Sequence, residues 1–492
     1  MFESSHPFAF FDYVRVPYAV EESAAAHDLP AGTGVLRGAD RAATGGRVLL
    51  WSRSGPGRAP RASRAGRFRL DGFTMAGHLR RGNPDAELRS HGSGWHPAEP
   101  ILDGKGRRIA SVWRDEKGSV FLPFDPGEVM HVLWSEKYTS LGARAAATRL
   151  ARTAAVRGYY AVRPLLPRGT QLRMRRAFAR SQDPAESFPA WPVEHSLHDM
   201  YDWLLATVAG VAGEPVPWIA PWPDGKEWAM VLSHDVETQA GVDDMELLRA
   251  DERSRGYRSG WNFVPERYDV TDAVRSAVTG DGCEVGVHGL RHDGRDLASR
   301  HLLEQRLPEI RRHADAWGAV GFRSPATQRA WELMSMLGFD YDSSYTDTDP
   351  YEPQPGGCCS YLPFFVEDTV ELPITLPQDH TLFEILQHRT GRTWVDKAHE
   401  IRRRGGLVLV LSHPDYARNP HAAAAWRELL EEFEHDSTRW QPLPHEAASW
   451  WRERAASDLR REGDGWVVSG PAAERASVRV TGAPEPAPAQ GR

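Results

Sequence analysis

Residues that could do acid, base and metal chemistry follow an apolar run near the middle of the chain. The stretch from Trp228 to Glu237 reads WAMVLSHDVE, so the run ends in a histidine and two carboxylates. This is typical of a buried strand that delivers functional side chains at its carboxyl end. Residues two apart on an extended chain point the same way, so Asp235 and Glu237 can face one site while Val236 packs behind them. Alone this pattern is weak, because two acids at a strand end are common.

A pair of histidines follows another apolar run further along the chain. The segment 284–293 reads EVGVHGLRHD, which puts His288 and His292 four residues apart. On one helical face, or in a tight turn, both imidazoles can reach a single metal ion. Isolated pairs at this spacing are often coincidental. The preceding strand and the glycine inside the pair favour a metal site here.

An arginine and a third histidine end two other apolar runs. Arg323 lies in the sequence GFRSPA at 321–326, where its guanidinium could hold a carboxylate in place and keep it ionised. The alternative is an ordinary surface ion pair. His413 ends the run LVLVLS at 407–412, where a general acid would be useful. The alternative for His413 is a satisfied core histidine.

The elements that must position these residues form an α/β pattern between residues 226 and 450. Short apolar runs alternate with helical patterns there, which is typical of an α/β barrel or a doubly wound sheet. The pattern predicts strands at 228–234, 284–288, 319–323, 370–374 and 407–412. It predicts helices at 296–316, 327–337, 393–404 and 421–434, the first kinked by Pro308. All four chemical fragments then lie at strand ends.

Taken together, these fragments resemble the motifs of a known enzyme family. The order Asp, His-x-x-x-His, Arg-x-Pro and Ser-His at strand ends is similar to that of the polysaccharide deacetylases, carbohydrate esterase family 4. The resemblance covers residues 226–450, somewhat under half of the chain. It implies a distorted (β/α) barrel with fewer than eight strands. It also implies a hydrolase that removes N-acetyl groups from an amino-sugar glycan.

The resemblance also implies a role for each matching residue. Asp235 is the catalytic base, oriented by Arg323, and His413 is the general acid. The backbone N–H of Ala326 helps to hold the oxyanion. His288 and His292 bind a divalent metal, which we expect to be Zn²⁺. Such a metal polarises the acetamide carbonyl and lowers the pKa of bound water toward ~7.

The first motif departs from the family pattern at the metal ligand. The family usually has Thr-Phe-Asp-Asp, with the second Asp on the metal, whereas this chain has Val236 there. Glu237 is the natural substitute, since its side chain is one methylene longer and faces the site by strand alternation. Alternatively, Asp235 binds the metal and Glu237 is the base. We favour the first arrangement.

Three further residues are candidates for contact with a substrate. The family's fourth motif is Asp-rich and usually ends in Trp, and residues 338–345 are similar around Asp342 but lack the Trp. Tyr345 is the candidate replacement for that wall residue. His380, in the sequence QDHTLF, is a candidate rim residue. The Gly- and Cys-containing segment 356–360 is either a lid over the site or a surface excursion.

The rest of the chain carries no catalytic pattern. We predict an α+β accessory region of unknown role at 1–145, an Arg-rich helical connector at 146–225, the catalytic barrel at 226–450, and an extension with a disordered tail at 451–492. Within these regions we expect a mobile basic loop at 53–67, a hairpin at 108–123, helices at 126–138 and 197–211, and a hairpin at 465–480.

The arginines from Arg144 to Arg180 allow two interpretations. They could dock on anionic glycolipid or membrane head groups. Alternatively, they belong to a solvated helical connector and pair with acidic patches of its neighbours. We favour the second interpretation.

Bulk properties limit the partners and the compartment. The net charge of −7 gives no reason to expect nucleic acid, and three cysteines among 492 residues fit a reducing compartment. The first residues lack a signal-peptide pattern, and no apolar segment approaches the ~18 residues of a membrane span. We therefore expect a cytoplasmic protein, with peripheral contact at the inner membrane face as an option.

The sequence leaves three hypotheses about function open. The first is de-N-acetylation of an amino-sugar glycan or of its lipid- or nucleotide-linked precursor. The second is hydrolysis of a non-sugar linear or cyclic amide. The third is a glycan-binding or scaffold protein with a degenerate metal site, for which Val236 is the main support. The presence of both histidines, Arg323 and His413 argues against the third hypothesis.

Overall fold

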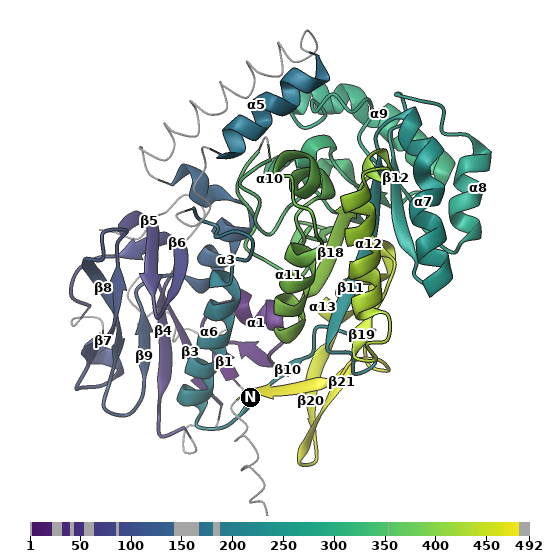
Figure 1. Ribbon diagram of the computed structural model, residues 1–492. Coiled ribbons are helices and arrows are strands. Elements are labelled where there is room, and N and C mark those ends of the chain that lie inside the picture. The colour runs from purple at the N-terminus through teal and green to yellow at the C-terminus, as the bar shows by residue number, and fades with distance from the viewer. Residues whose placement is uncertain are drawn as a thin grey trace, which may run out of the picture. The chain divides into compact units, whose positions relative to one another are not determined.

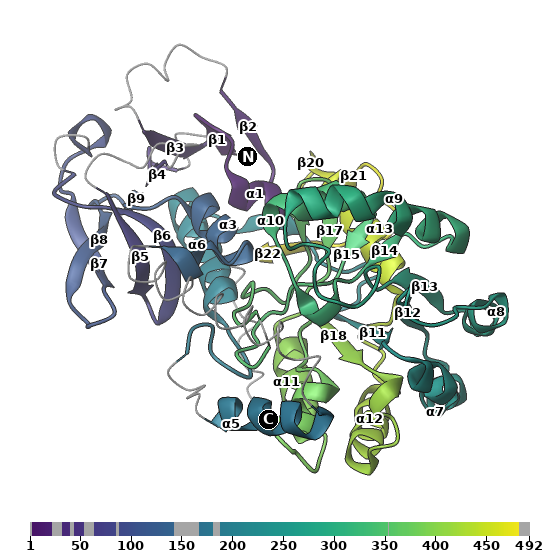
Figure 2. The ribbon, with the colours of Figure 1, turned by 90° about the horizontal axis from the view of Figure 1, so that it is seen from above.

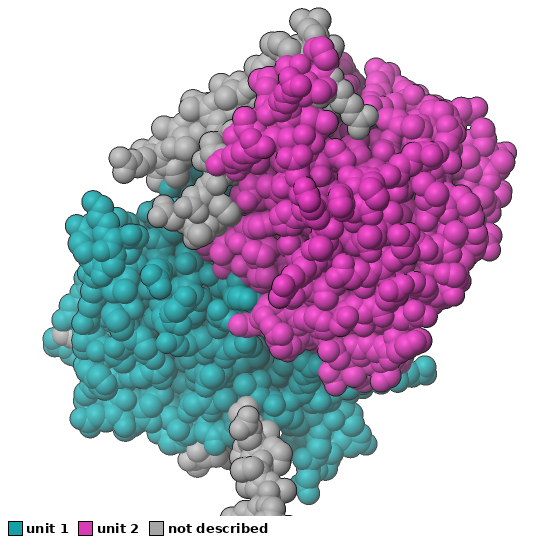
Figure 3. Space-filling model, viewed as in Figure 1, with its two compact units in different colours: residues 1–148, 195–220, 453–492 teal, residues 149–194, 221–452 magenta. Residues whose placement is uncertain are grey.

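The structure is a computed structural model that describes residues 2–21, 32–39, 44–53, 63–84, 88–141, 167–180, 187–352 and 354–481. By its contacts the chain forms two compact units, coloured separately in Figure 3. Unit 1 comprises residues 1–148, 195–220 and 453–492, and unit 2 comprises residues 149–194 and 221–452. The four-part division along the sequence stays a prediction. No helix among the described residues is long and apolar enough to cross a membrane.

Unit 1 is built on a nine-stranded sheet, in the order β2-β1-β3-β4-β9-β8-β7-β5-β6. Its strands are β1 (Phe2–Ser4), β2 (Tyr18–Val20), β3 (Thr33–Gly38), β4 (Val48–Ser52), β5 (Ser63–Leu70), β6 (Phe73–Arg80), β7 (His96–Leu102), β8 (Arg108–Arg114) and β9 (Val120–Leu122). Its helices are α1 (Ala9–Val14), α3 (Pro126–Trp134) and α6 (Ser196–Ala212). The predicted hairpin, formed by β8 and β9, and the helix at 197–211 are confirmed.

Two local predictions for unit 1 need correction. The expected loop at 53–67 is wrong from Ser63 onward, because that part is strand β5, paired along its length with β6. Residues 54–62 lie outside the described residues. The hairpin expected at 465–480 is instead formed by β20 (Asp458–Glu462) and β21 (Gly465–Ser469), with Gly463 turning at a positive φ of 58°. The later strand, β22 (Val478–Thr481), pairs with β10 (Val216–Ile219).

Unit 2 contains the predicted parallel sheet, seen from above in Figure 2. The strand order is β16-β17-β15-β14-β13-β12-β11-β18, and β19 pairs with β11. The strands are β11 (Trp228–Val236), β12 (Ser259–Phe263), β13 (Glu284–Val287), β14 (Gly321–Phe322), β15 (Tyr341–Asp342), β16 (Phe364–Val366), β17 (Thr369–Glu371), β18 (Leu407–Ser412) and β19 (Arg439–Trp440). Every pair is parallel except β16 with β17. The α/β class is confirmed.

Backbone hydrogen bonds also link the segment after β17 to the far end of this strand path. The N–H groups of Thr375 and Leu376 donate to the carbonyl of Leu409 in β18, at 3.1 and 3.0 Å. The segment that follows β17 is therefore tied to the middle of β18, although the two strands stand near opposite ends of the strand order.

Helices lie between successive parallel strands of unit 2 (Figure 1). They are α7 (Gln239–Arg255), α8 (Asp272–Gly280), α9 (Arg300–Trp317), α10 (Trp331–Met334), α11 (Arg392–Arg403) and α12 (Pro420–Phe433), and α13 (Pro444–Ala455) follows β19. The first predicted helix starts four residues late, because Ser299 caps α9 by accepting from the N–H of Leu302. The helix predicted at 327–337 shrinks to α10 and a following 3-10 turn, Ser335–Leu337.

The two faces of β11 point to different surroundings. Trp228, Met230, Leu232 and Val236 lie in one hydrophobic cluster that includes residues of α7, α11 and α12. By strand alternation, Asp235 faces the other way. The core therefore fixes β11 from behind while its carboxyl end remains available for polar side chains.

The described arginines of the connector pair with acidic neighbours. Helix α5 (Arg168–Arg180) places Arg175 Nη2 at 3.7 Å from Glu352 Oε2, and Arg176 Nη2 at 3.9 Å from Glu384 Oε2. These two ion pairs agree with the connector interpretation, which stays a prediction. The predicted helical sequence at 142–166 lies outside the described residues.

Candidate active site

The site begins with Asp235 at the carboxyl end of β11. Its Oδ1 accepts hydrogen bonds from Asn262 Nδ2 at 2.9 Å and from Arg323 Nη1 at 3.3 Å. The side chain is buried. Burial disfavours the carboxylate, but the charges of His288 and Arg323 outweigh burial and lower the pKa of Asp235. Asp235 is therefore an ionised carboxylate with a defined orientation.

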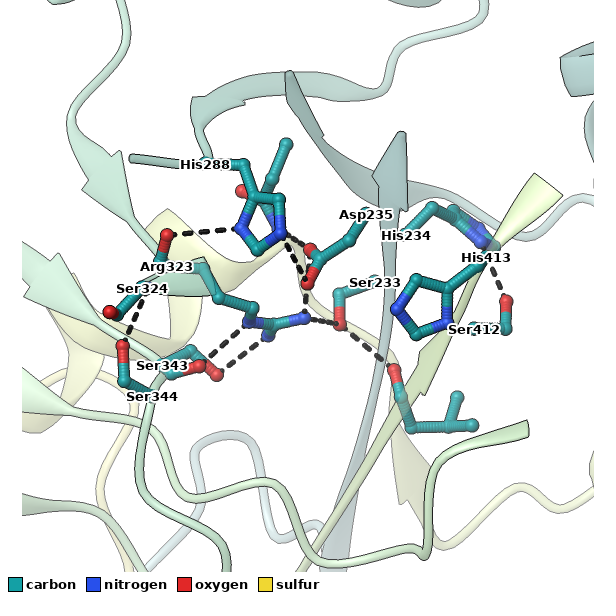
Figure 4. Close-up of polar contacts among 12 residues, drawn as sticks. Ser233, His234, Asp235, His288, Arg323, Ser324, Ser343, Ser344, Ser412 and His413 are labelled. Atoms are coloured by element: carbon teal, nitrogen blue, oxygen red, sulfur yellow. Dashed lines mark hydrogen bonds and ion pairs between the residues drawn. The ribbon is translucent and has the colours of Figure 1, made fainter. Parts of the chain in front are cut away.

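His288 has a nitrogen suited to a metal ion. Its Nδ1 lies 3.1 Å from the carbonyl oxygen of Arg323, and since a carbonyl only accepts, Nδ1 must carry the proton. The other nitrogen, Nε2, is buried, has no hydrogen-bond partner and faces Asp235 Oδ2 at 3.6 Å (Figure 4). Burial lowers the pKa of His288 to about 4, so the ring is neutral near pH 7. A neutral ring with its free lone pair at Nε2 is the form that binds metals.

Glu237 and His292 stand beside this nitrogen. Glu237 Oε1 lies 2.9 Å from His292 Nε2. Burial disfavours the charge of Glu237, but His292 outweighs it and holds the pKa of Glu237 well below its usual range. His292 sits at a positive φ of 54°, in a turn rather than on a helix. Of the two geometries expected for the histidine pair, the structure has the tight turn.

The loop that carries both histidines is held by an ion-paired arginine. Arg306 of α9 bonds Asp293 and Asp296, each at 2.6 Å. Asp296 also accepts from the N–H of Leu290 at 3.1 Å. These bonds fix the turn between His288 and His292 before any ligand binds.

Glu237, His288 and His292 together could hold a metal ion, because one ligand atom from each lies within 4.8 Å of the others. The donor set of two imidazoles and one carboxylate is a common catalytic zinc set. The unpartnered Nε2 of His288 fits such an ion as well. A second group, Glu266, Glu309 and His313, also meets the distance criterion among the described residues. It is largely exposed, and Glu266 is already paired with Arg291.

Arg323 is buried and bonds to residues of β11 and to the residue that follows β15. Its Nε donates to the carbonyl of Ser343 at 2.7 Å, and its Nη2 donates to Ser343 Oγ at 2.8 Å. Its Nη1 donates to Ser233 Oγ at 3.0 Å as well as to Asp235 (Figure 4). These bonds leave the guanidinium no freedom to swing away from Asp235. Arg323 is a buried ion-pair partner and not a surface one.

His413 is held as a proton donor. Its Nδ1 lies 2.6 Å from Asp379 Oδ1, and its backbone N–H donates to Asp379 Oδ2 at 2.7 Å. Burial would lower the pKa of His413, but Asp379 outweighs burial and raises it to about 10. Its Nε2 lies 3.7 Å from Glu237 Oε1. The ring is therefore an imidazolium near pH 7, next to the candidate metal ligands.

A buried histidine and serine behind the site keep strands β11 and β18 in register. His234 Nδ1 lies 2.8 Å from Ser412 Oγ, and His234 Nε2 lies 2.7 Å from Glu252 Oε1. His234 and Ser412 are register partners of β11 and β18. They immediately precede Asp235 and His413, so this contact fixes the candidate base and acid relative to each other.

Ala326 lies in a tight turn next to the histidine loop. It has a positive φ of 55° within the 3-10 turn Pro325–Thr327. A side chain at Gly289, the residue after His288, would meet Pro325 Cδ at 2.6 Å. This close approach brings the turn of Ala326 against the loop that starts at His288.

The three candidate substrate residues have different surroundings. Asp342 is buried and accepts from the N–H of Ser344, and burial raises the pKa of both Asp342 and its partner Glu371. Tyr345 is buried in an aromatic cluster, at 6.0 Å from the ring of Phe364. Neither has a described contact with the metal candidates, so a role in substrate binding stays a prediction for both.

His380 is linked to the site through an aromatic ring. It lies on the π-helical turn His380–Ile385, and its ring centroid is 5.2 Å from that of Tyr416. Tyr416 is in turn 5.5 Å from the ring of His413. The ring of Tyr416 therefore lies between His380 and the candidate acid, His413. Its role at the rim stays a prediction.

Sequence reasoning missed two residues that bond directly to the catalytic candidates. Asn262 is the register partner of Asp235 on β12, a strand whose sequence SGWNF does not look like an apolar run. Asp379 belongs to none of the motifs and stands directly before His380, the candidate rim residue. An acid adjacent to a suspected rim histidine was the available signal for Asp379.

Comparisons with known proteins find likeness at the level of structure alone. No family model matches the chain, and no curated protein matches it. A solved structure from Mycobacterium smegmatis, described as a polysaccharide deacetylase, is 20% identical with a TM-score of 0.40, over 49% of this chain and 98% of the other. The Puue allantoinase is 16% identical with a TM-score of 0.39, over 47% and 92%. A family 4 carbohydrate esterase from Streptomyces lividans is 13% identical with a TM-score of 0.29, over 42% and 91%.

These neighbours include the family whose motifs the sequence resembles. Their identities and TM-scores are too low to transfer an activity. What this chain does must therefore be argued from its own residues.

Proposed function

We propose that this protein is a metal-dependent hydrolase that removes N-acetyl groups from an amino-sugar glycan or a glycan precursor. The observation that carries the proposal is the buried, unpartnered Nε2 of His288, with Glu237 and His292 close enough to share an ion with it. A neutral imidazole kept free of hydrogen bonds in a buried site is costly unless a ligand fills the position. A degenerate scaffold would have no need of that arrangement.

Each candidate residue has a task in this reaction. A divalent metal, which we propose to be Zn²⁺, would supply a Lewis acid for the acetamide carbonyl and for the attacking water. Asp235, kept ionised by Arg323, takes the proton of that water. His413 gives the proton on its Nε2 to the departing amine, and Asp379 keeps this imidazolium charged. The backbone N–H of Ala326 donates to the developing oxyanion. Acetate and a free amino sugar leave.

The contacts of the two carboxylates support one of the two arrangements of metal ligand and base. Glu237 shares the metal candidate group with both histidines, and Asp235 is not part of that group. Asp235 instead accepts hydrogen bonds from Arg323 and Asn262, which fix the orientation of its carboxylate. A general base needs such a fixed orientation to receive the proton of the attacking water. We therefore propose Glu237 as the ligand and Asp235 as the base.

The finer parts of the proposal concern fold, substrate and place of action. We propose that the bonds from Thr375 and Leu376 to Leu409 close the sheet as a distorted barrel. Tyr345, Asp342 and His380 are proposed to line the sugar site. A lipid- or nucleotide-linked precursor handled in the cytoplasm is the proposed substrate. The exposed Arg173 and Met174 of α5 would be the points of any contact with anionic head groups.

Hydrolysis of a panel of compounds tests this proposal, measured as acetate release for the N-acetylated compounds and as loss of the intact amide by chromatography for the others. The panel contains N-acetylated mono- and oligosaccharides, nucleotide-linked amino sugars, and linear and cyclic amides, each assayed with added Zn²⁺ and with chelator. We expect chelator-sensitive acetate release from the N-acetyl sugars alone. Hydrolysis of the non-sugar amides alone would contradict the sugar substrate and indicate a linear or cyclic amide instead. No hydrolysis, together with glycan binding, would indicate the scaffold.

A further inference from the structure

The peptide group that joins Val236 to Glu237 is held at both of its polar atoms. The hydroxyl of Tyr268 donates to the carbonyl of Val236, and the N–H of Glu237 donates to Asp415 Oδ2 at 3.0 Å. Tyr268 is fixed in turn, because its oxygen accepts from the N–H of Val264 at 3.1 Å. A peptide group bonded at both ends cannot rotate about the chain axis. The direction in which the Glu237 side chain leaves the backbone is therefore set.

Asp415 is bound to the start of α7 as well. The hydroxyl of Thr238 donates to its other oxygen, Oδ1, and also accepts from the N–H of Gly241 as the cap of α7. A side chain at position 241 would lie 2.2 Å from Asp415 Oδ2. The glycine thus allows the carboxylate to approach the backbone at the end of β11.

Glu237 needs such support because it lies beyond the sheet. The pairing of β11 with β12 ends at Val236, and its pairing with β18 ends at His234. Ladder hydrogen bonds therefore hold Asp235 but stop before Glu237. Metal ligands are oriented by the groups bonded behind them, and loss of such groups typically weakens metal binding 10–100-fold.

We propose that Tyr268 and Asp415 are positioning residues that hold Glu237 as the acidic ligand of the metal. The acidic ligand is expected at position 236, the last residue of β11, but that residue is Val236. Glu237, the first residue after the strand, takes its place, and Tyr268 and Asp415 compensate for this shift. The inference rests on the metal site proposed above, and it goes further by assigning a role to two residues outside that site.

The dissociation constant for Zn²⁺, measured by competition with a chromogenic chelator, tests the inference on the full chain. The variants are Tyr268→Phe, Asp415→Ala and Asp415→Asn. We expect the first two to bind Zn²⁺ about 10–100-fold more weakly than the unmodified protein. Asp415→Asn should bind more tightly than Asp415→Ala, because its amide oxygen can still accept from the N–H of Glu237.

Tyr257→Phe is the matched control. Tyr257 also donates its buried hydroxyl to a backbone carbonyl, that of Leu430, but is not bonded to the site. It should bind Zn²⁺ as the unmodified protein does, although it loses a similar bond. All measurements are made at a temperature below the thermal unfolding midpoint of every variant. This separates ligand positioning from general destabilisation. If Asp415→Ala fails to fold, Tyr268→Phe still tests the positioning role, because it removes only one oxygen atom.

The failure of the inference differs from the failure of the metal site. If the unmodified protein binds one Zn²⁺ and His288→Ala loses it, but Tyr268→Phe and both Asp415 variants bind normally, the positioning role is wrong. An equal loss in Tyr257→Phe would also overturn it. If the unmodified protein binds no Zn²⁺, or His288→Ala binds it equally well, the metal site itself is wrong and the inference falls with it.

Discussion

At the scale of single residues, two histidines of the site are driven to opposite protonation states by their neighbours. His288 is buried against a backbone carbonyl, so its pKa falls to about 4 and it stays neutral. His413 is equally buried, but Asp379 outweighs that burial and raises its pKa to about 10. The first is the form needed by a metal ligand and the second is the form needed by a general acid.

The pKa of His413 predicts the alkaline limit of activity. The value of kcat/KM should fall near pH 10, where His413 loses its proton. A pH profile of acetate release measures this limb. An alkaline limb near 6.5, the ordinary value for histidine, would mean that His413 is not held by Asp379 as described.

Asp379→Asn should shift the alkaline limb to lower pH, because it removes the charge that holds the proton on His413. It should also lower stability. The folded pKa of His413 lies above its ordinary 6.5, so the stabilisation is complete below pH 6.5 and is lost as pH rises through about 10. Denaturant unfolding at pH 6 and pH 10 should therefore differ less for Asp379→Asn than for the unmodified protein. An equal difference in both would contradict the assignment.

At the scale of elements, the apolar strands were predictable and the polar contacts between them were not. β11 and β18 read as unbroken apolar runs, and both are confirmed. β12 was missed because Ser259 and Asn262 interrupt its pattern, although both side chains are buried and hydrogen-bonded. The residue types that do chemistry were recognisable by motif. Asp379 was not singled out, because its bond to His413 spans 34 residues.

The approach of α7 to the loop after β18 gives a prediction for Gly241. Replacing a helical glycine by alanine usually stabilises by up to ~1 kcal/mol. Gly241→Ala should instead destabilise by about 1–3 kcal/mol, because its Cβ would lie 2.2 Å from Asp415 Oδ2. Denaturant unfolding measures the difference. Gly210→Ala is the control, since this glycine lies within α6 with nothing within 4 Å of an added Cβ. A stabilised Gly241→Ala protein would contradict the close packing.

At the scale of the whole molecule, the residues of the proposed reaction all belong to unit 2. Unit 1 holds its own nine-stranded sheet and contributes none of the catalytic or metal candidates. The accessory region was predicted as α+β, and its strands and helices among the described residues agree with that class. Its role could not be predicted, because its residues carry no pattern of acids, histidines or nucleophiles at strand ends.

The central claim is that hydrolysis depends on a metal held by Glu237, His288 and His292. Metal-free protein, prepared with chelator, is titrated with Zn²⁺ while acetate release from an N-acetylated oligosaccharide is measured. We expect no release without metal, full release at one equivalent of Zn²⁺, and none at any concentration for His288→Ala. Undiminished release by the metal-free protein, or by His288→Ala, would contradict the account.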